Sequence, residues 1–221
     1  ADLGPRRGID RRAARRGRLT RRGLRTSATV AAMPGTALIL IDVQQEYFDP
    51  QSSLRIPDGP AVLGRLAGLL AEARDHGVTV IHVRHTEEPG AEWFDPDGPR
   101  VAIRDEVAPA DGEPVIEKHL PGAFHDTGLS DLLEAAGTER VVIGGFMTHM
   151  CCDTTAREAA HRGYEVLFLS DGTATRDLDG PDGSTIGHGA VQAAILAAQA
   201  DGFSTPTDVA SVQARVATGE L

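Results

Sequence analysis

Short aliphatic runs alternate with longer amphipathic stretches along most of this chain, and this alternation constrains the fold more than any other feature. The first run, residues 36–43 (TALILIDV), is almost continuously apolar. Such a run is typical of a strand buried on both faces of a parallel sheet. Residues 61–76 then repeat apolar side chains at helical spacing and end at Gly77. The fold is therefore expected to begin with a strand followed by a helix.

The same pattern recurs towards the C-terminus. It predicts strands at residues 79–83, 116–118, 141–144 and 166–169, and helices at residues 129–136, 151–162 and 189–200. Repeated strand–helix units with glycine stops favour an α/β fold, a mainly parallel sheet with helices on both faces. Residues 86–114, rich in Pro, Gly and Asp, are too long for a simple connection. We interpret them as a loop that covers a substrate, with a surface insertion as the alternative.

Charge divides the chain into two parts of opposite sign. Residues 1–33 contain ten arginines and two aspartates, a net charge of +8, whereas the rest contains 12 basic and 30 acidic residues, a net charge of −18. We interpret residues 1–33 as an Arg-rich extension outside the fold and residues 34–221 as one domain. A transit peptide or a nucleic-acid-binding arm is the alternative for the extension. The acidic body should repel nucleic acid and anionic membranes, so we expect neither as a partner.

The cysteine content is limited to Cys151 and Cys152. Two adjacent cysteines cannot build the disulfide framework of a small secreted domain. No run reaches the roughly 18 apolar residues that a membrane span requires. We therefore expect a cytoplasmic protein without a membrane segment.

Polar side chains stand at the ends of three predicted strands. Asp42 interrupts the first aliphatic run, Lys118 ends the strand at 116–118, and Cys151 opens the predicted helix at 151–162. Ligand sites of open parallel sheets lie at the carboxyl ends of the strands, which makes these residues candidates. A buried carboxylate is costly unless paired or functional, and a helix N-terminus lowers a thiol pKa. Taken one at a time, each residue has a structural alternative. Asp42 could cap a loop, Lys118 could be an ordinary surface lysine, and Cys151 could be an inert buried thiol.

Together with residues 144–157 (GGFMTHMCCDTTAR), these three residues resemble the isochorismatase-like cysteine hydrolase family, in its amidohydrolase branch. The resemblance extends over residues 36–212 and includes the segments LILIDVQQEYF, EKHLPGAFHDTGL and SDGTATRD. It implies a single-domain, three-layer α/β/α sandwich around a Rossmann-like sheet. It also implies a catalytic triad of Asp42, Lys118 and Cys151.

The resemblance further specifies the nucleophile and its surroundings. Cys151 rather than Cys152 matches the family nucleophile, since Thr155 follows it four positions later. A cis peptide bond is implied between Phe146 and Met147. The backbone N–H groups of Met147 and Cys151 would then form the oxyanion hole.

These residues support hydrolysis of a carbon–nitrogen bond. Asp42 would take the proton of the Cys151 thiol, the thiolate would attack a carbonyl, and water would hydrolyse the resulting thioester. Lys118 would orient the carboxylate and keep it charged. We therefore expect a hydrolase of a small-molecule amide, lactam or carbamoyl bond that needs no cofactor.

The pocket is less well specified by the sequence. Nicotinamidases of this superfamily carry an Asp-x-His and a second His that bind a metal, but residues 81–86 read IHVRHT, without the aspartate. We therefore expect no metal, with His82 as a packed strand residue. Eight residues are expected to bind the substrate, with core packing as an equal alternative for each aromatic one: Tyr47, Phe48, His85, Trp93, Phe94, Phe124, Thr148 and His149.

Three other functions stay open at this point. One is hydrolysis of a vinyl ether, as isochorismatases perform, or of an ester. Another is a redox switch built on Cys151 and Cys152, although adjacent cysteines form only a strained ring. The third is a binding module with a basic nucleic-acid-binding arm. We expect a homo-oligomer, a dimer or a tetramer.

Overall fold

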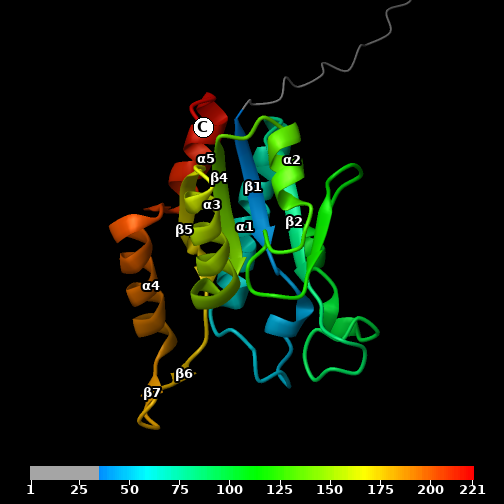
Figure 1. Cartoon of the computed structure of the whole chain (residues 1–221), viewed down its shortest axis with the longest axis vertical. Helices are drawn as coiled ribbons and strands as arrows, with labels where there is room; N and C mark the ends of the chain where they lie inside the picture. Colours follow the sequence, from blue (N-terminus) through cyan, green and yellow to red (C-terminus); the bar gives the residue numbers. More distant parts are fainter. Residues whose placement is uncertain (1–34) are drawn as a thin grey trace, which may run out of the picture.

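A six-stranded parallel sheet forms the centre of the structure, a computed structural model that describes residues 35–221 (Figure 1). The strands lie in the order β3-β2-β1-β4-β5-β8. The predicted extension at residues 1–33 lies outside the described residues. The sheet consists of β1 (Thr36–Ile41), β2 (Thr79–His85), β3 (Val115–Lys118), β4 (Arg140–Phe146), β5 (Glu165–Ala174) and β8 (Thr205–Thr207), and a separate antiparallel pair consists of β6 (Leu178–Asp179) and β7 (Thr185–Ile186).

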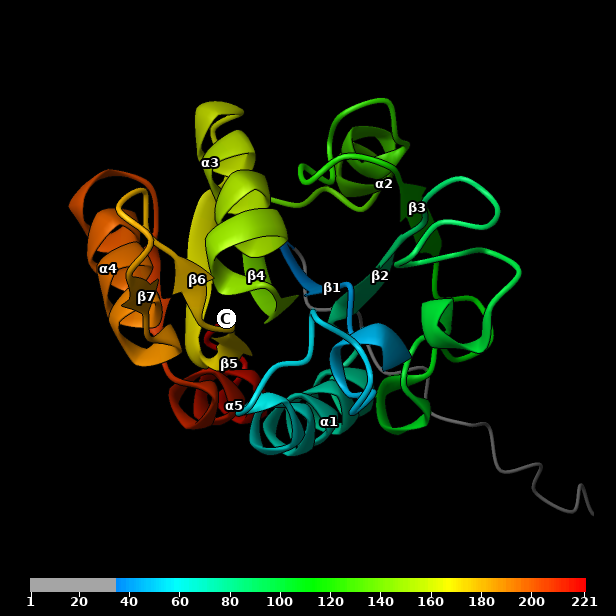
Figure 2. The same cartoon turned by 90° about the horizontal axis from the view of Figure 1, so that it is seen from below.

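Helices cover both faces of this sheet. They are α1 (Gly59–Asp75), α2 (Leu129–Ala135), α3 (Asp153–His161), α4 (His188–Gly202) and α5 (Val209–Thr218). Figure 2 shows α1 and α5 on one face and α2 and α3 on the other, with α4 beyond β5 at the edge of the sheet. This arrangement confirms the predicted three-layer α/β/α sandwich. No helix within residues 35–221 is long and apolar enough to cross a membrane.

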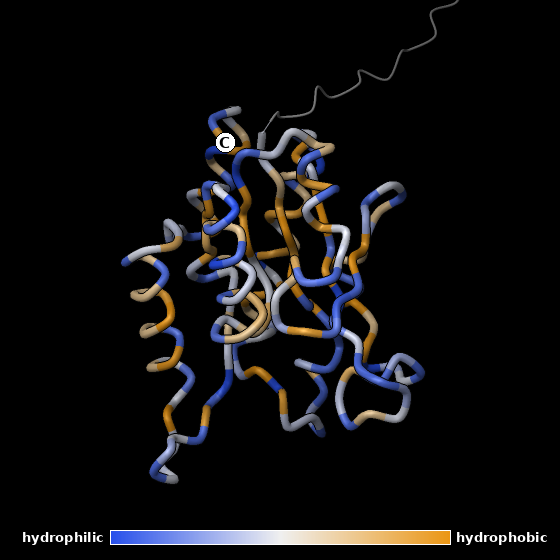
Figure 3. Tube along the Cα trace, in the orientation of Figure 1, coloured by the Kyte–Doolittle hydropathy of each residue, from blue (hydrophilic) through white to orange (hydrophobic). Residues whose placement is uncertain are grey.

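Alternate side chains of the central strands enter two separate hydrophobic cores. In β1, Leu38 and Leu40 pack with side chains of α1 and α5, whereas Ile39 and Ile41 pack with side chains of α2 and α3. Both faces of β1 are therefore buried, which explains why its sequence is apolar without alternation. Figure 3 shows the hydrophobic residues concentrated along the central strands.

The predicted strands and helices are all present, with ends that differ by a few residues. The helix expected at residues 151–162 is the main exception, because residues Thr148–Cys152 form a π-helical turn, η4, and α3 begins only at Asp153. The last strand and helix, β8 and α5, were not predicted. Three residues with a central Pro206 are too few to give β8 a recognisable pattern.

The long segment at residues 86–114 folds back over the carboxyl end of β1. It contains two 3-10 turns, η2 (Pro99–Val101) and η3 (Asp105–Val107). The backbone N–H of Gln45 donates to the carbonyl of Ala102 at 2.8 Å, and the N–H of Arg104 donates to the carbonyl of Val43 at the same distance. The segment thus lies where a substrate-covering loop is expected, and that role stays a prediction.

A buried carboxylate anchors this segment. Glu46 lies in the 3-10 turn η1 (Gln45–Tyr47) and is fully buried. Its Oε1 accepts hydrogen bonds from Ser52 Oγ at 2.6 Å and from Arg100 Nη1 at 3.0 Å, and its Oε2 accepts the backbone N–H of Phe94 at 3.2 Å. Since a buried charge is stable only when it is paired and hydrogen-bonded, these contacts fix the segment against η1.

The carboxyl ends of β1 and β4 form the topological switch point of the sheet. The chain runs from β1 towards β3 at one edge and from β4 towards β8 at the other. Such a point is where open α/β sheets bind ligands. The two strands approach very closely here, because Gly145 pairs with Ile41 and adopts a φ of +125°. A Cβ atom on Gly145 would lie 2.0 Å from the Ile41 carbonyl oxygen.

We expect Gly145→Ala to lower the free energy of unfolding by more than about 2 kcal/mol, because the methyl group meets backbone and the φ is strained for any L-residue. Urea unfolding followed by circular dichroism measures this loss. Gly64→Ala is the matched control, since Gly64 lies in α1 with no atom within 4 Å of the added Cβ. It should be neutral or stabilising by up to about 1 kcal/mol. Equal stability of the two variants would contradict the close approach of β1 and β4.

Glu113 joins the loop before β3 to α1 and β2. Its carboxylate accepts hydrogen bonds from Arg74 Nη2 at 2.7 Å and from the backbone N–H of Ala110 at 2.9 Å, and it lies 2.9 Å from His82 Nε2. The hydrogen bonds from Arg74 are the main reason that the pKa of Glu113 is lowered to about 2. His82 is itself buried, as expected of a packed strand residue.

Glu113→Gln should lower the free energy of unfolding at pH 7 by about 1–3 kcal/mol, the cost of weakening a network of partly buried polar groups. Because the folded-state pKa lies below the ordinary value of 4.5, the contribution of Glu113 is complete above pH 4.5 and is lost as the pH falls towards 2. Thermal melts of both proteins from pH 7 to pH 2.5 should therefore converge. Glu117→Gln, whose partner Arg84 is exposed, should cost less. A constant difference at all pH values would exclude this role of the Glu113 carboxylate.

Candidate active site

The structure brings Asp42, Lys118 and Cys151 together at the carboxyl edge of the sheet. Asp42 follows β1, Lys118 is the last residue of β3, and Cys151 lies in η4 after β4. Lys118 Nζ is 2.8 Å from Asp42 Oδ2 and 3.3 Å from Cys151 Sγ. Asp42 and Cys151, which are distant in sequence, thus contact the same ammonium group.

All three side chains are shielded from solvent. The side chains of Asp42 and Lys118 are 0 % exposed, and Cys151 is 5 % exposed. Asp42 adopts a φ of +51°, a left-handed conformation that non-glycine residues rarely occupy. Among the described residues, its Oδ1 has no hydrogen-bond partner. A buried carboxylate with a free oxygen next to a thiol is suited to accept a proton.

The electrostatics of Cys151 differ from the sequence-based expectation. Burial raises the pKa of the thiol, the charge of Asp42 raises it further, and Lys118 opposes them only in part. The expected lowering of this pKa by a helix N-terminus is therefore wrong. Cys151 lies in the buried turn η4, beside a carboxylate, rather than at the exposed start of α3. A thiol whose pKa is raised needs a base to act as a nucleophile.

Lys118 keeps its charge in this buried position. Burial alone would lower the pKa of its ammonium group, but the charges of Asp42 and Cys151 outweigh burial, so the pKa is raised. Cys152 is a different case, because it is fully buried in the core formed with α2 and α3, and burial raises its pKa strongly. Only Cys151 contacts the ammonium group.

Met147 links β4 to η4, and the peptide bond between Phe146 and Met147 is cis, as the family resemblance implies. The carbonyl of Met147 accepts the backbone N–H groups of Met150 at 3.0 Å and Cys152 at 3.3 Å. These bonds hold the turn that carries Cys151. The proposed oxyanion-hole donors, the N–H groups of Met147 and Cys151, thus belong to one backbone turn.

Three of the predicted pocket residues pack together beside the triad. Tyr47 lies edge-on to Phe94, with 5.4 Å between ring centroids, and the rings of Phe94 and His85 are 5.0 Å apart. Burial raises the pKa of the Tyr47 phenol, and the largest charge effect on it comes from Cys151. Both ring nitrogens of His85 contact protein groups, Lys118 Nζ and Glu87 Oε1. His85 is therefore engaged with the protein itself rather than open to a substrate.

The other three predicted aromatic residues make their contacts elsewhere. Phe48 packs against Phe146 and beneath the guanidinium of Arg104. The indole N–H of Trp93, on a side chain that is partly exposed, donates to Ser53 Oγ. Phe124 belongs to the core beside α2 and α3. For Phe48 and Phe124 the structure favours the packing alternative, whereas Trp93 is exposed and outside the cores, so its contact with a substrate stays a prediction.

Thr148 and His149 flank the nucleophile within η4. Thr148 is fully buried, and its Oγ1 has no hydrogen-bond partner among the described residues. His149 Nδ1 lies 2.6 Å from Thr175 Oγ1. Burial, and then the charge of Arg176, lowers the pKa of His149, which keeps its imidazole neutral. Both residues remain candidates for contacting a substrate.

A small cavity that the sequence did not reveal opens beside Lys118. Its volume is about 190 Å³, and its lining consists of Lys118, His119, Leu120, His125 and Asp126. These residues belong to the segment EKHLPGAFHDTGL, which has no periodicity that would show which side chains face a cavity. Gln44 was also missed, although a polar residue after the buried run of β1 was a usable signal. Within residues 35–221, no three His, Cys, Asp or Glu side chains are grouped as metal ligands.

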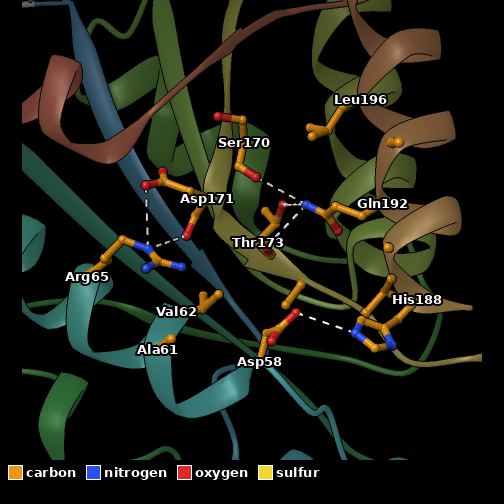
Figure 4. Close-up of a pocket in the computed structure, with 14 residues that line it drawn as sticks. Asp58, Ala61, Val62, Arg65, Ser170, Asp171, Thr173, His188, Gln192 and Leu196 are labelled. Carbon is orange, nitrogen blue, oxygen red and sulfur yellow. Dashed lines mark hydrogen bonds and ion pairs between the residues drawn. The ribbon is translucent and has the colours of Figure 1, made fainter.

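A larger pocket of about 380 Å³ lies apart from the triad, between α1, α4 and the carboxyl end of β5 (Figure 4). Gln192 donates from its amide to the backbone carbonyl of Ser170, and Arg65 pairs with Asp171. None of the triad residues lines this pocket. Thr175, whose Oγ1 lies 2.6 Å from His149 Nδ1 of η4, also lines this pocket.

Comparison with known proteins identifies the family. Residues 36–202 match the family model of the isochorismatase domain. The secreted isochorismatase effector Isc1 of Verticillium dahliae is 35 % identical over 158 residues, which cover 72 % of this chain and 82 % of that protein. A maleamate amidohydrolase of Pseudomonas putida is 32 % identical, covering 65 % and 74 %.

The fold leads to the same family. The crystal structure of an isochorismatase from Pseudomonas putida superposes with a TM-score of 0.76 at 36 % identity, covering 82 % of this chain and 91 % of that one. The resemblance inferred from the motifs is thus confirmed over most of the described residues. This chain belongs to the isochorismatase family.

Proposed function

We propose that this protein is a cysteine-dependent hydrolase that cleaves a carbon–nitrogen bond of a small molecule, an amide, lactam or carbamoyl group, through a thioester. The observation that carries the proposal is the position of Lys118 Nζ, 2.8 Å from Asp42 Oδ2 and 3.3 Å from Cys151 Sγ. A base and a nucleophile that contact the same cation are suited to nucleophilic acyl transfer. The similarity to a maleamate amidohydrolase supports the same bond type.

Activation of the thiol is a proton transfer inside a closed cluster. Asp42, whose buried carboxylate raises the pKa of Cys151, takes the thiol proton as the thiolate attacks the substrate carbonyl. Lys118 first neutralises the Asp42 carboxylate and then the thiolate. Because the ammonium contacts both atoms, the transfer moves negative charge without leaving it unpaired.

The remaining steps use the same groups. Attack forms the Cys151 Sγ–carbon bond and a tetrahedral oxyanion, which the N–H groups of Met147 and Cys151 would stabilise. Protonated Asp42 then returns its proton to the leaving nitrogen, the carbon–nitrogen bond breaks, and an amine or ammonia departs. Asp42 next removes a proton from water, which attacks the thioester and releases the acid and the thiol.

The size of the site restricts the substrate. The cavity beside Lys118 holds about 190 Å³, and Cys151 is 5 % exposed. Such a site excludes a folded polypeptide and is below the usual volume of drug-sized ligand pockets, about 300–1,000 Å³. We therefore infer that the substrate is a small molecule.

Cys151→Ser should lower amide turnover by at least about 1000-fold, because the nucleophile is lost. Cys152→Ser is the matched control, and it should keep most of the activity since Cys152 lies in the core away from Lys118. A screen of small amides, lactams and carbamoyl compounds with detection of ammonia and amines measures turnover. Mass spectrometry of the quenched wild-type protein should show an acyl group on Cys151. Turnover of a vinyl ether that survives Cys151→Ser, without any acyl-enzyme, would favour isochorismatase-type chemistry instead.

Asp42→Asn should lower turnover by at least about 100-fold, the scale of positioned proton transfer. It should also speed iodoacetamide labelling of Cys151, because the carboxylate that raises the thiol pKa is gone while Lys118 remains. Opposite changes in turnover and labelling distinguish loss of the base from loss of the fold. Asp75→Asn, an exposed change at the end of α1 and away from the cavity, is the control and should alter neither. Near-normal turnover of Asp42→Asn would remove Asp42 from the mechanism.

A further inference from the structure

We infer that His85 is a positioning residue for Lys118: as a neutral imidazole it accepts the third N–H of the ammonium group, and Glu87 fixes the tautomer that makes this possible. The inference deepens the proposed function and rests on it. His85 is the last residue of β2, next to β3 in the sheet, and pairs with Lys118 in the strand register. It thus adds a fourth element to a site built from β1, β3 and η4.

The hydrogen-bond partners of Lys118 determine the protonation of His85. An ammonium group has three N–H donors and no acceptor. It forms an ion pair with Asp42 Oδ2 at 2.8 Å and hydrogen-bond contacts with His85 Nδ1 at 3.0 Å and Cys151 Sγ at 3.3 Å, and an ammonium group can only donate. Nδ1 must therefore be the unprotonated, accepting nitrogen of His85.

The other ring nitrogen has the complementary partner. His85 Nε2 lies 2.9 Å from Glu87 Oε1, and a carboxylate can only accept. The proton of the neutral ring is therefore on Nε2, which donates to Glu87. Glu87 thus determines which ring nitrogen bears the proton and which faces Lys118. A carboxylate orients the catalytic histidine of other enzymes in the same way.

The backbone and ring of His85 are held on several sides. Gln44 accepts the backbone N–H of His85 on Oε1 at 2.8 Å and donates from Nε2 to its carbonyl at 2.9 Å. Gln44 Nε2 also donates to the carbonyl of Val101 at 2.7 Å. Gln44 thus connects residues 86–114 to the backbone of His85. The ring of Phe94 packs against the imidazole. These contacts leave the His85 ring little freedom to turn.

A second proton on His85 would disrupt the site. The imidazolium would direct an N–H at the ammonium of Lys118 and add a positive charge 3.0 Å away. The charged or titratable groups facing the ring are Lys118 from β3 and Glu87, with Asp42 and Cys151 beyond the ammonium; Phe94 is uncharged. Lys118 would lose its alignment on Asp42 and Cys151.

Two substitutions test the hydrogen bond that His85 accepts from Lys118. In His85→Asn, the side-chain oxygen can take the place of Nδ1 as the acceptor. His85→Leu removes the acceptor at similar size. We expect His85→Leu to lower kcat by about 10- to 100-fold with KM little changed, the scale on which orienting groups act. His85→Asn should restore most of kcat.

The tautomer is measured independently of catalysis. Nitrogen-15 NMR of the full chain at pH 8, with His85→Asn for assignment, should show an unprotonated Nδ1 and a protonated Nε2 on His85. His76→Asn, a change on the partly exposed end of α1, is the control for both measurements. A protonated Nδ1, or equal losses of kcat in the Asn and Leu variants, would overturn the inference. If the wild-type protein forms no thioester with any amide, the proposed function fails, while the NMR result still decides the state of His85.

Discussion

The buried ammonium group of Lys118 is the interaction on which the site depends. It lies within contact distance of groups from the ends of β1, β2 and of the turn after β4, and Lys118 itself ends β3. Removing a lysine and a carboxylate from water costs several kcal/mol for each ion, about as much as a small domain's whole stability margin. That cost is offset only if the charges stay paired. Each strand or turn that supplies a contact to Lys118 must therefore end at a position that brings its side chain to the ammonium group.

The sheet topology meets this requirement by its strand order. β1 and β4 are neighbours at the switch point, so Asp42 and the turn carrying Cys151 emerge side by side. Gly145 allows the backbones to approach where any side chain would collide with Ile41. Residues 86–114, which follow β2, lie at the same edge of the sheet and are held there by hydrogen bonds to the buried carboxylate of Glu46. The strand ends, Gly145 and residues 86–114 thus together hold the groups that surround the Lys118 ammonium.

Much of this arrangement could be predicted from the sequence, because local patterns carry it. The aliphatic run of β1 specifies a doubly buried strand, and the segments around Asp42, Lys118 and Cys151 identify the family. The pKa of Cys151 could not be predicted, since it depends on burial and on a carboxylate more than 100 positions away. Gln44 could have been noticed as a polar residue after the buried run, but its contacts to His85 could not be predicted, because they span 41 residues of sequence. Pairwise geometry of this kind leaves no periodic trace.

The charge balance of the triad has a consequence for the rest of the molecule. Carboxylate, ammonium and thiol sum to zero, and they still sum to zero after the proton has moved from Cys151 to Asp42. The surroundings therefore experience a rotated dipole rather than a new net charge, and a dipole's field falls off faster with distance than that of a net charge. The strongly acidic surface of the body can thus change by several charges with little effect on the energy of this step. Solubility and encounter with the substrate can be tuned on the outside of the protein while the chemistry inside stays the same.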